Sequence, residues 1–318
     1  MTVPPTSAIS ISGLTKTFGE HTVLAGIDLE VAAGTVFSLL GPNGAGKTTM
    51  VRILATLSRA DSGEIRVAGH DLAHEPDAVR RLIGVTGQYS AVDSVLTGAE
   101  NLRLMGRLLH LGKPETVRRT ARLLEQFELT NAAHARVATY SGGMRRRLDL
   151  AMSLMSEPLI IFLDEPTTGL DPRSRRELWQ VIRNLVADGV TIFLTTQYLE
   201  EADQLADRIA VLHNGKIVAA GTPGDLKQLA PGGHIQLRFA DRHGLAAAAR
   251  TVPLAEIDAD QLTLQVPSDG SVGALKQLLD QFDDQAITID ELAIHTPDLD
   301  DVFFALTGHP TTEKAALL

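Results

Sequence analysis

Cysteine is absent from the 318 residues of this chain, and long apolar runs are missing as well. Without cysteine the chain forms neither disulfides nor thiolate metal sites, although this absence indicates little about the cellular compartment. The apolar run at 159–163 has only the length of a strand, well below the roughly eighteen residues of a membrane helix. Residues 1–10 lack the basic start and the long apolar core of a signal peptide. We therefore expect a soluble, cytoplasmic protein.

Positive charge is scarce, and negative charge is unevenly distributed. The formal net charge is −10, and residues 231–318 alone carry five Lys/Arg against fourteen Asp/Glu. This change of composition near Pro231 predicts two domains, at 1–230 and 231–318. An acidic chain without a basic stripe is a poor candidate for holding nucleic acid by its phosphates, so we expect no nucleic-acid partner. The ten histidines show no spacing typical of metal ligands.

The spacing of apolar residues predicts an α/β first domain with a helical insertion. Residues 35–40 form a continuous apolar run, as expected of a buried strand, and residues 47–57 continue as a helix. Residues 90–157 repeat apolar side chains at helical spacing and predict a helical subdomain. Further strands are predicted at 9–14, 23–31, 159–163, 190–195 and 208–212, with a hairpin turn at Asn214-Gly215.

The second domain is predicted to be a smaller α+β unit. Its strand-like segments are 234–239, 261–266 and 286–294, and a helix-like segment lies at 274–279. Thr296-Pro297-Asp298 combines a capping hydroxyl, a first-turn proline and an acidic residue, which is typical of a helix start. We therefore expect a helix at 299–306 that stops at Gly308.

A glycine-rich loop joins the apolar strand to the following helix. It matches G-x-x-x-x-G-K-T with Gly41, Pro42, Asn43, Gly44, Ala45, Gly46, Lys47 and Thr48, and Thr49 follows. Glycines let backbone N–H groups point inward and cradle phosphate oxygens at the N-terminus of a helix. We expect Lys47 to neutralise the β- and γ-phosphates and the Thr48 hydroxyl to bind Mg²⁺, which takes octahedral oxygen coordination. The strand–loop–helix order thus predicts a site for a nucleoside triphosphate with Mg²⁺.

Two carboxylates, Asp164 and Glu165, end the apolar strand at 159–163. Paired carboxylates at a strand end suit two separate tasks. Asp164 is expected to hold the Mg²⁺ shell, and Glu165 to orient and deprotonate the attacking water.

The Ser141-Gly142-Gly143 turn lies upstream of this pair and opens another helix. Its glycines allow close backbone approach to phosphate, and the helix supplies a positive N-terminus. Arg145, Arg146 and Arg147 follow directly. We interpret these arginines as an exposed cationic face at the start of the helix rather than as a nucleic-acid contact.

Taken together, these motifs resemble the ATP-binding-cassette (ABC) family, in which two cassettes clamp ATP between them. The resemblance covers residues 9–225 and implies a P-loop NTPase fold: a RecA-like core with antiparallel β and helical subdomains, here followed by the small C-terminal α+β domain. It also implies that Ser141–Gly143 contacts the γ-phosphate bound to the other subunit. Tyr140 and Met144 depart from the family's usual Leu-Ser-Gly-Gly-Gln signature.

Four further positions gain a role only through this resemblance. Gln88 matches the loop that senses Mg²⁺ and connects the core to the helical subdomain, and Asp171 matches the loop that crosses the dimer interface. Phe18 lies where relatives stack an aromatic ring on adenine, although core packing is the alternative. Gln197 stands where most relatives carry the switch histidine. A glutamine amide donates a hydrogen bond to the γ-phosphate but carries no positive charge, which leaves the rate of hydrolysis open.

A finer resemblance is to the ATP-binding subunits of daunorubicin-resistance-type drug exporters. It rests on Val85–Tyr89, Thr139–Arg147, Asp171–Arg175, Leu194–Leu205 and Leu299–Pro310. By this resemblance Gln197 is a trait of the group rather than a sign of inactivity. In such relatives the C-terminal domain supports assembly of the ATPase dimer or of its membrane partner.

The resemblance implies an ATP hydrolase that acts as a homodimer at the cytoplasmic face of the membrane. The pair would drive a separate integral membrane permease that exports a hydrophobic drug, an antibiotic or a lipid. One alternative is a nucleotide-dependent regulatory subunit with little hydrolysis, which Gln197 favours. Another is an ABC ATPase that acts on ribosomes or DNA without a membrane, which the single cassette and the lack of a basic patch disfavour. The cargo is not readable from this chain, because cargo contacts lie in the permease.

Overall fold

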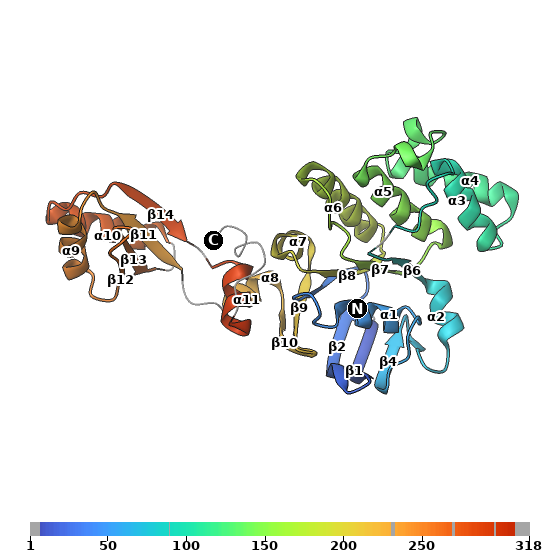
Figure 1. Cartoon of the computed structure of the whole chain (residues 1–318), viewed down its shortest axis with the longest axis horizontal. Coiled ribbons are helices and arrows are strands. Elements are labelled where there is room, and N and C mark those ends of the chain that lie inside the picture. Colours follow the sequence, from blue (N-terminus) through green and yellow to red (C-terminus); the bar gives the residue numbers. More distant parts are fainter. Residues whose placement is uncertain (1–6, 89, 230–232, 269–270, 296, 309–318) are drawn as a thin grey trace, which may run out of the picture. The chain divides into compact units, whose positions relative to one another are not determined.

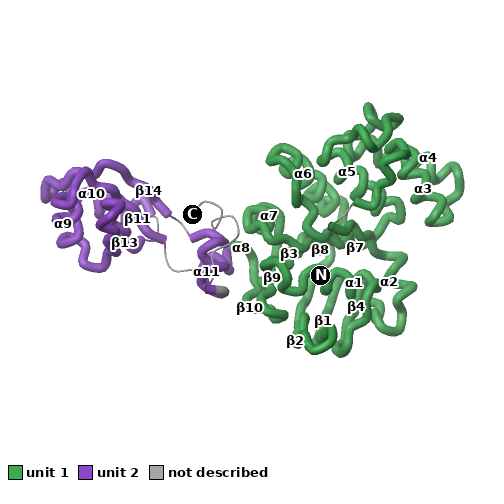
Figure 2. Tube along the Cα trace, viewed as in Figure 1, with its two compact units in different colours: residues 1–223 green, residues 224–318 purple. Residues whose placement is uncertain are grey.

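The chain folds into two compact units, residues 1–223 and 224–318 (Figure 2). The computed structural model describes residues 7–88, 90–229, 233–268, 271–295 and 297–308. The boundary expected near Pro231 falls outside these ranges and stays a prediction.

A six-stranded sheet forms the centre of the first unit (Figure 1). The strands are β3 (Val36–Leu40), β6 (Ile83–Thr86), β7 (Ile160–Asp164), β8 (Thr191–Thr196), β9 (Arg208–His213) and β10 (Lys216–Gly221). Their order is β10-β9-β3-β8-β7-β6, with parallel neighbours except for the antiparallel hairpin of β9 and β10. That hairpin turns at Asn214 and Gly215, which both have positive φ as a tight two-residue turn requires, so this expectation is confirmed.

Side chains of the central strands alternate between two apolar cores. In β7, Ile160 and Phe162 belong to one core, whereas Ile161 and Leu163 belong to the other. The alternation arises because successive side chains of a strand point to opposite faces of the sheet. Burial on both faces explains why β3 and β7 are almost continuously apolar.

Helices cover both faces of this sheet. The helices that precede α8 are α1 (Lys47–Leu54), α2 (Pro76–Leu82), α3 (Gly98–Leu108), α4 (Lys113–Gln126), α5 (Gly142–Ser153), α6 (Pro172–Ala187) and α7 (Leu199–Leu205). Figure 1 shows α5 and α6 on one side of the sheet and α1 on the other. The helix expected at 47–57 is shorter than predicted, because Thr56 adopts a left-handed φ of 61° just beyond its end. Within the described ranges of both units, no helix has the length and apolar character to cross a membrane.

A four-stranded antiparallel sheet of order β2-β1-β4-β5 shares the core on the α1 side. Its strands are β1 (Ser7–Phe18), β2 (His21–Ala32), β4 (Ser62–Val67) and β5 (His70–Asp71). Ile9 and Leu24 of this sheet are buried in the same apolar cluster as Met50 and Ile53 of α1. The antiparallel sheet therefore packs against α1, the helix that follows the glycine-rich loop, and supports its position.

The segment between β6 and β7 is helical, as predicted for residues 90–157. Besides α3, α4 and α5 it contains the 3-10 helices η1 (Thr130–Ala132), η2 (Val137–Thr139) and η3 (Leu154–Ser156). Tyr140 is buried in its core and donates a hydrogen bond of 2.7 Å to the carbonyl of Ala132. A Cβ at position 98 would lie 2.3 Å from the Tyr140 hydroxyl, so Gly98 makes the space for this tyrosine.

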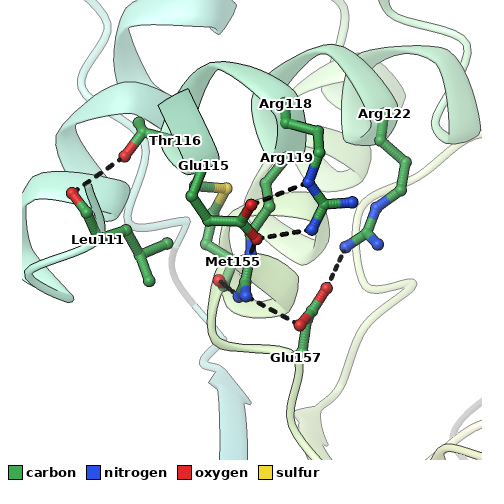
Figure 3. A network of polar contacts seen from close by, with 8 residues as sticks. All are labelled: Leu111, Glu115, Thr116, Arg118, Arg119, Arg122, Met155 and Glu157. Atoms are coloured by element: carbon green, nitrogen blue, oxygen red, sulfur yellow. Dashed lines mark hydrogen bonds and ion pairs between the residues drawn. The ribbon is translucent and has the colours of Figure 1, made fainter. Parts of the chain in front are cut away.

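An ionic network ties α4 to the chain that leads into β7 (Figure 3). Glu115 accepts hydrogen bonds from Arg118 and Arg119, and together they lower its pKa to about 2. Arg119 also donates 2.8 Å to the carbonyl of Met155 and lies 2.9 Å from Glu157, which Arg122 contacts as well. These contacts fix the position of α4 within the helical segment.

The second unit contains a four-stranded antiparallel sheet of order β12-β13-β11-β14. Its elements are β11 (His234–Arg238), α9 (Arg242–Thr251), β12 (Glu256–Asp258), β13 (Thr263–Pro267), α10 (Val272–Asp284), β14 (Glu291–His295) and α11 (Leu299–Thr307), and α8 (Pro223–Lys227) overlaps the division between the units. Leu237, Phe239 and Leu264 pack with Leu245 of α9 and Phe282 of α10 to form its core. The small α+β architecture is as predicted.

Details of this unit differ from the sequence expectation. The strand expected at 286–294 begins only at Glu291, because Ala286 has a left-handed φ of 53° and ends the preceding helical turn. Helix α11 is capped by the side chain of Asp298, which accepts from Asp301 N, and it ends at Gly308 in the left-handed region. The capping hydroxyl expected from Thr296 lies outside the described residues.

Candidate functional site

The glycine-rich loop runs from the end of β3 to the start of α1. Gly41 N donates 3.2 Å to the carbonyl of Thr196, which fixes the start of the loop to the end of β8. Gly46 has a φ of 111°, and a Cβ there would lie 2.9 Å from the Val23 carbonyl, so no other residue fits this position without strain. Along the loop, Asn43, Gly44 and Thr48 are exposed, Pro42 and Thr49 are half-buried, and Gly41, Ala45, Gly46 and Lys47 are buried.

Lys47 is folded back into its own loop. Its Nζ donates 2.7 Å to the carbonyl of Gly41 and 3.1 Å to that of Pro42, and it lies 3.5 Å from Glu165 Oε1. Burial lowers the pKa of the ammonium group, an effect that the carboxylates of Glu165 and Asp164 oppose. The loop lysine and the carboxylate pair therefore meet, as a shared phosphate site requires.

Asp164 and Glu165 are held by the neighbouring strand β8. Thr195 Oγ1 donates 2.5 Å to Asp164 Oδ1 and accepts 3.2 Å from Glu165 N, which also donates 3.1 Å to the Thr195 carbonyl. Glu165 has a left-handed φ of 47°, a backbone conformation that residues other than glycine rarely adopt. Sequence reasoning missed Thr195, although a hydroxyl at the end of an otherwise apolar strand was a usable signal.

Arg146 is the clearest correction to the sequence interpretation. It does not lie on an exposed face: only 8% of the residue is accessible. Its guanidinium donates 2.8 Å to the carbonyl of Pro166, 2.8 Å to that of Gly87 and 3.3 Å to that of Asp164. The prediction was wrong for Arg146 because three adjacent residues of a helix point in different directions. Arg145 is exposed as expected, whereas the side chain of Arg147 is only 13% accessible and pairs with Glu128, so the prediction was wrong for Arg147 as well.

The Ser141–Gly143 turn begins α5, and Ser141 Oγ caps the helix by accepting 3.2 Å from Met144 N. Ser141 and Gly142 are exposed, whereas a Cβ at Gly143 would lie only 2.6 Å from Ser174 Oγ. Ser174 Oγ in turn donates 2.6 Å to Asp171, and this bond lowers the pKa of that carboxyl. The turn and the start of α6 thus pack closely against each other.

The remaining predicted residues lie apart from this cluster or make few contacts with it. Gln88 is exposed just beyond β6, and Gln197 is half-buried just beyond β8. Phe18 is 54% exposed with Lys16 Nζ 5.1 Å from its ring centroid, so it is not a core residue. Tyr89 lies outside the described residues. Among the described residues, no hydrogen bond or ion pair joins the Ser141–Gly143 turn to the loop at 41–48.

The oxygen donors near the loop fit a magnesium ion that is held mainly by phosphates. No group of three or more His, Cys, Asp or Glu side chains in the described ranges forms a metal cage. Mg²⁺ in nucleotide sites typically uses one or two protein oxygens together with phosphate and water. The Thr48 hydroxyl and the Asp164 carboxylate are suitable donors of this kind.

In the central sheet, the glycine-rich loop with its lysine follows β3, and the paired carboxylates lie at the end of β7, two strands away in the sheet. This arrangement defines a P-loop nucleotide-binding protein. A family model described as "ABC transporter" matches residues 24–168. The chain is 49% identical to the daunorubicin resistance ATP-binding protein DrrA2 of Streptomyces coeruleorubidus, covering 97% of this chain and 98% of the relative. It is 47% identical to the daunorubicin/doxorubicin resistance ATP-binding protein DrrA of Streptomyces peucetius, over 99% and 98% of the two chains.

More distant relatives include the Nod factor export ATP-binding protein I of Ralstonia nicotianae, with 38% identity over 95% of this chain and 94% of the relative. Among solved structures, an ATP-binding subunit of an ABC transporter superposes with a TM-score of 0.62 at 30% identity, over 70% of this chain and 92% of its own. A dimeric cassette in a post-hydrolysis state bound to ADP and Pi gives a TM-score of 0.60 at 27% identity, over 67% and 98%. The chain belongs to the ABC transporter ATP-binding family, and it is an ATP hydrolase. The predicted fold class is confirmed.

Proposed function

We propose that this chain energises the export of a hydrophobic drug, an antibiotic or a lipid through a separate membrane permease. The observation that carries the proposal is the likeness to daunorubicin resistance ATP-binding proteins, which covers 97% of the chain and so includes both compact units. The pore must then belong to another chain, on which this subunit is held at the cytoplasmic face of the membrane.

ATP would bind with its phosphates along the Gly41–Thr48 loop. Lys47 would exchange its contacts with the Gly41 and Pro42 carbonyls for the β- and γ-phosphate oxygens. Thr48, Asp164 and Gln88 would hold Mg²⁺, which when bound neutralises charge that develops on the transferred phosphoryl group. The exposed ring of Phe18 would stack on the adenine.

Hydrolysis would depend on Glu165 and Gln197. Glu165, whose carboxylate lies 3.5 Å from Lys47 Nζ, would orient the attacking water and accept its proton. The Gln197 amide would donate a hydrogen bond to the γ-phosphate from the end of β8.

The complete site would form between two copies of the chain. The Ser141–Gly143 turn presents Ser141 and Gly142 to solvent and makes no polar contact with its own phosphate loop among the described residues. In a head-to-tail pair the turn would contact the γ-phosphate on the partner's loop, and Asp171 would lie at the contact between the subunits.

The test is co-expression of the chain with a candidate permease encoded beside it, followed by co-purification and ATP turnover with daunorubicin as the probe. We expect a stable complex whose turnover rises with the drug. We expect Glu165→Gln to lower that turnover by about 100-fold or more, the contribution typical of a general base. Equal, near-zero turnover of both proteins would indicate a regulatory subunit. Failure to co-purify with the permease, together with turnover that neither permease nor drug changes, would contradict the transport function.

A further inference from the structure

A buried arginine connects three segments of the candidate site that are far apart in the sequence. Arg146 lies on α5, shortly after the Ser141–Gly143 turn, and its Nε donates 2.8 Å to the Pro166 carbonyl. Its Nη2 donates 3.3 Å to the Asp164 carbonyl, and its Nη1 donates 2.8 Å to the Gly87 carbonyl. The first two carbonyls flank Glu165, and the third directly precedes Gln88.

These bonds complete the fixation of the Glu165 backbone. On the amide side, Glu165 N is held by the carbonyl and the hydroxyl of Thr195. The guanidinium of Arg146 holds the Asp164 carbonyl, which belongs to the same peptide group as Glu165 N, and the carbonyl of Pro166, the residue after Glu165. A residue with a left-handed φ of 47° keeps that conformation only when its surroundings determine it fully.

The charge of the guanidinium is balanced by a second buried group. Asp149 Oδ2 lies 3.4 Å from Arg146 Nη1, and Asp149 Oδ1 accepts 3.1 Å from Ala91 N. Burial raises the pKa of Asp149 and lowers that of Arg146, while the two opposite charges oppose both shifts. The pair therefore also contacts the chain on the far side of Gln88.

We propose that Arg146 is a positioning residue that sets the backbone of Glu165 and couples it to the Gln88 segment and to α5. The proposal rests on the proposed role of Glu165 in hydrolysis. A movement of α5, of Gly87 or of Ala91 would then shift the carboxylate that activates water, while Lys47 and the phosphate loop remain in place. Arg146 thus acts on the chemical step and not on ATP binding.

The test compares Arg146→Gln with Arg146→Lys in the full chain, in the complex with the permease if turnover requires it. Arg146→Gln loses the guanidinium that donates to three carbonyls. It should lower kcat by roughly 10- to 100-fold, the range for groups that position a catalytic residue. KM for ATP and the binding of a fluorescent ATP analogue should stay unchanged. Lysine keeps the charge beside Asp149 but cannot span the three carbonyls, so Arg146→Lys should recover thermal stability without recovering kcat.

Arg119→Gln is the matched control. Arg119 is also largely buried, ion-paired and bonded to a main-chain carbonyl, but it contacts none of the candidate site residues (Figure 3). Arg119→Gln should lower the thermal stability and leave kcat and KM for ATP unchanged. Hydrogen–deuterium exchange should rise at 163–168 and 84–88 in Arg146→Gln but not in Arg119→Gln, a readout that does not need activity.

The outcomes separate the two proposals. If Glu165→Gln keeps full turnover, the proposed role of Glu165 fails, and the positioning role of Arg146 fails with it. If Glu165→Gln is inactive while folded Arg146→Gln keeps normal kcat, only the inference about Arg146 is overturned. The same conclusion follows if Arg146→Lys recovers kcat together with stability, or if Arg119→Gln loses as much kcat as Arg146→Gln.

Discussion

At the scale of single residues, the site depends on a hydroxyl and a guanidinium group that hydrogen-bond to the two carboxylate residues and to the main chain beside them. Asp164 and Glu165 do not define their own geometry. Thr195 contacts both of them, and Arg146 holds the carbonyls of Asp164 and Pro166. A conservative change at a supporting residue should therefore affect catalysis without touching the nucleotide.

Thr195→Val is the cleanest such change, because valine has nearly the same shape and lacks only the hydroxyl. It removes the hydrogen bond to the Asp164 carboxylate and leaves Asp164 almost fully buried. We expect the free energy of unfolding to fall by about 1–3 kcal/mol. ATP turnover should fall further than the loss of folded protein explains, as measured by urea unfolding and steady-state kinetics.

Thr191→Val on the same strand is the control for this prediction. Thr191 Oγ1 accepts 2.9 Å from Gly34 N at the other end of β8, away from the carboxylates. Thr191→Val should lower the free energy of unfolding about as much as Thr195→Val does, but it should keep the kcat of the wild type. Equal kinetic effects from both variants would show that Thr195 has only a structural role.

At the scale of secondary-structure elements, the sequence predicted the site better than it predicted its supports. The strand at β7, the loop at 41–48 and the start of α5 all follow from local patterns, namely an apolar run, glycines before a helix and a Ser-Gly-Gly turn. The contacts of Arg146 could not be predicted in this way. Its acceptors are main-chain carbonyls as far as 59 positions away, and every residue has such a carbonyl, so no sequence pattern marks them.

The helix α4 allows a prediction about pH. The Glu115 carboxyl has its pKa lowered from 4.5 to about 2 by Arg118 and Arg119, so the folded state binds its proton less readily than the unfolded state. Its stabilising contribution is therefore fully present above the unfolded pKa and is lost as the pH falls toward the folded value. Glu115→Gln should lower the urea midpoint at neutral pH, and the difference from the wild type should shrink at about pH 3.

Glu125→Gln serves as the control, because Glu125 is exposed on the same helix and, among the described residues, Arg118 and Arg119 bond to Glu115 and not to Glu125. The urea midpoint of Glu125→Gln should equal that of the wild type at neutral pH and at about pH 3. A Glu115→Gln difference that stays constant with pH would mean that the network in Figure 3 does not stabilise the ionised carboxylate.

At the scale of the whole molecule, the proposed dimer predicts complementation between two defective chains. Lys47→Ala removes the phosphate contact of a chain's own loop, whereas Ser141→Asp keeps the helix cap but brings a negative charge toward the partner's phosphate. Each homodimer should be inactive. A mixed dimer, isolated through two different tags, should regain turnover, because one of its two composite sites contains neither change.

Two differently tagged Lys47→Ala chains are the control, since their dimer has no intact site. Ser141→Asn, a neutral cap, should leave far more activity than Ser141→Asp. Inactive mixed dimers, or an active Ser141→Asp homodimer, would contradict a site shared between subunits.

The contact between Gly143 and Ser174 has a genetic consequence. Because a Cβ at position 143 would collide with a hydroxyl that also holds Asp171, any substitution there deforms two parts of the proposed subunit contact at once. The damaged chain still has an intact phosphate loop and still folds around the same cores. If it pairs with wild-type chains, it removes working pairs from the population. If the chain drives drug export as proposed, alleles at Gly143 should therefore be dominant, and their expression in a resistant cell should restore sensitivity to the exported drug.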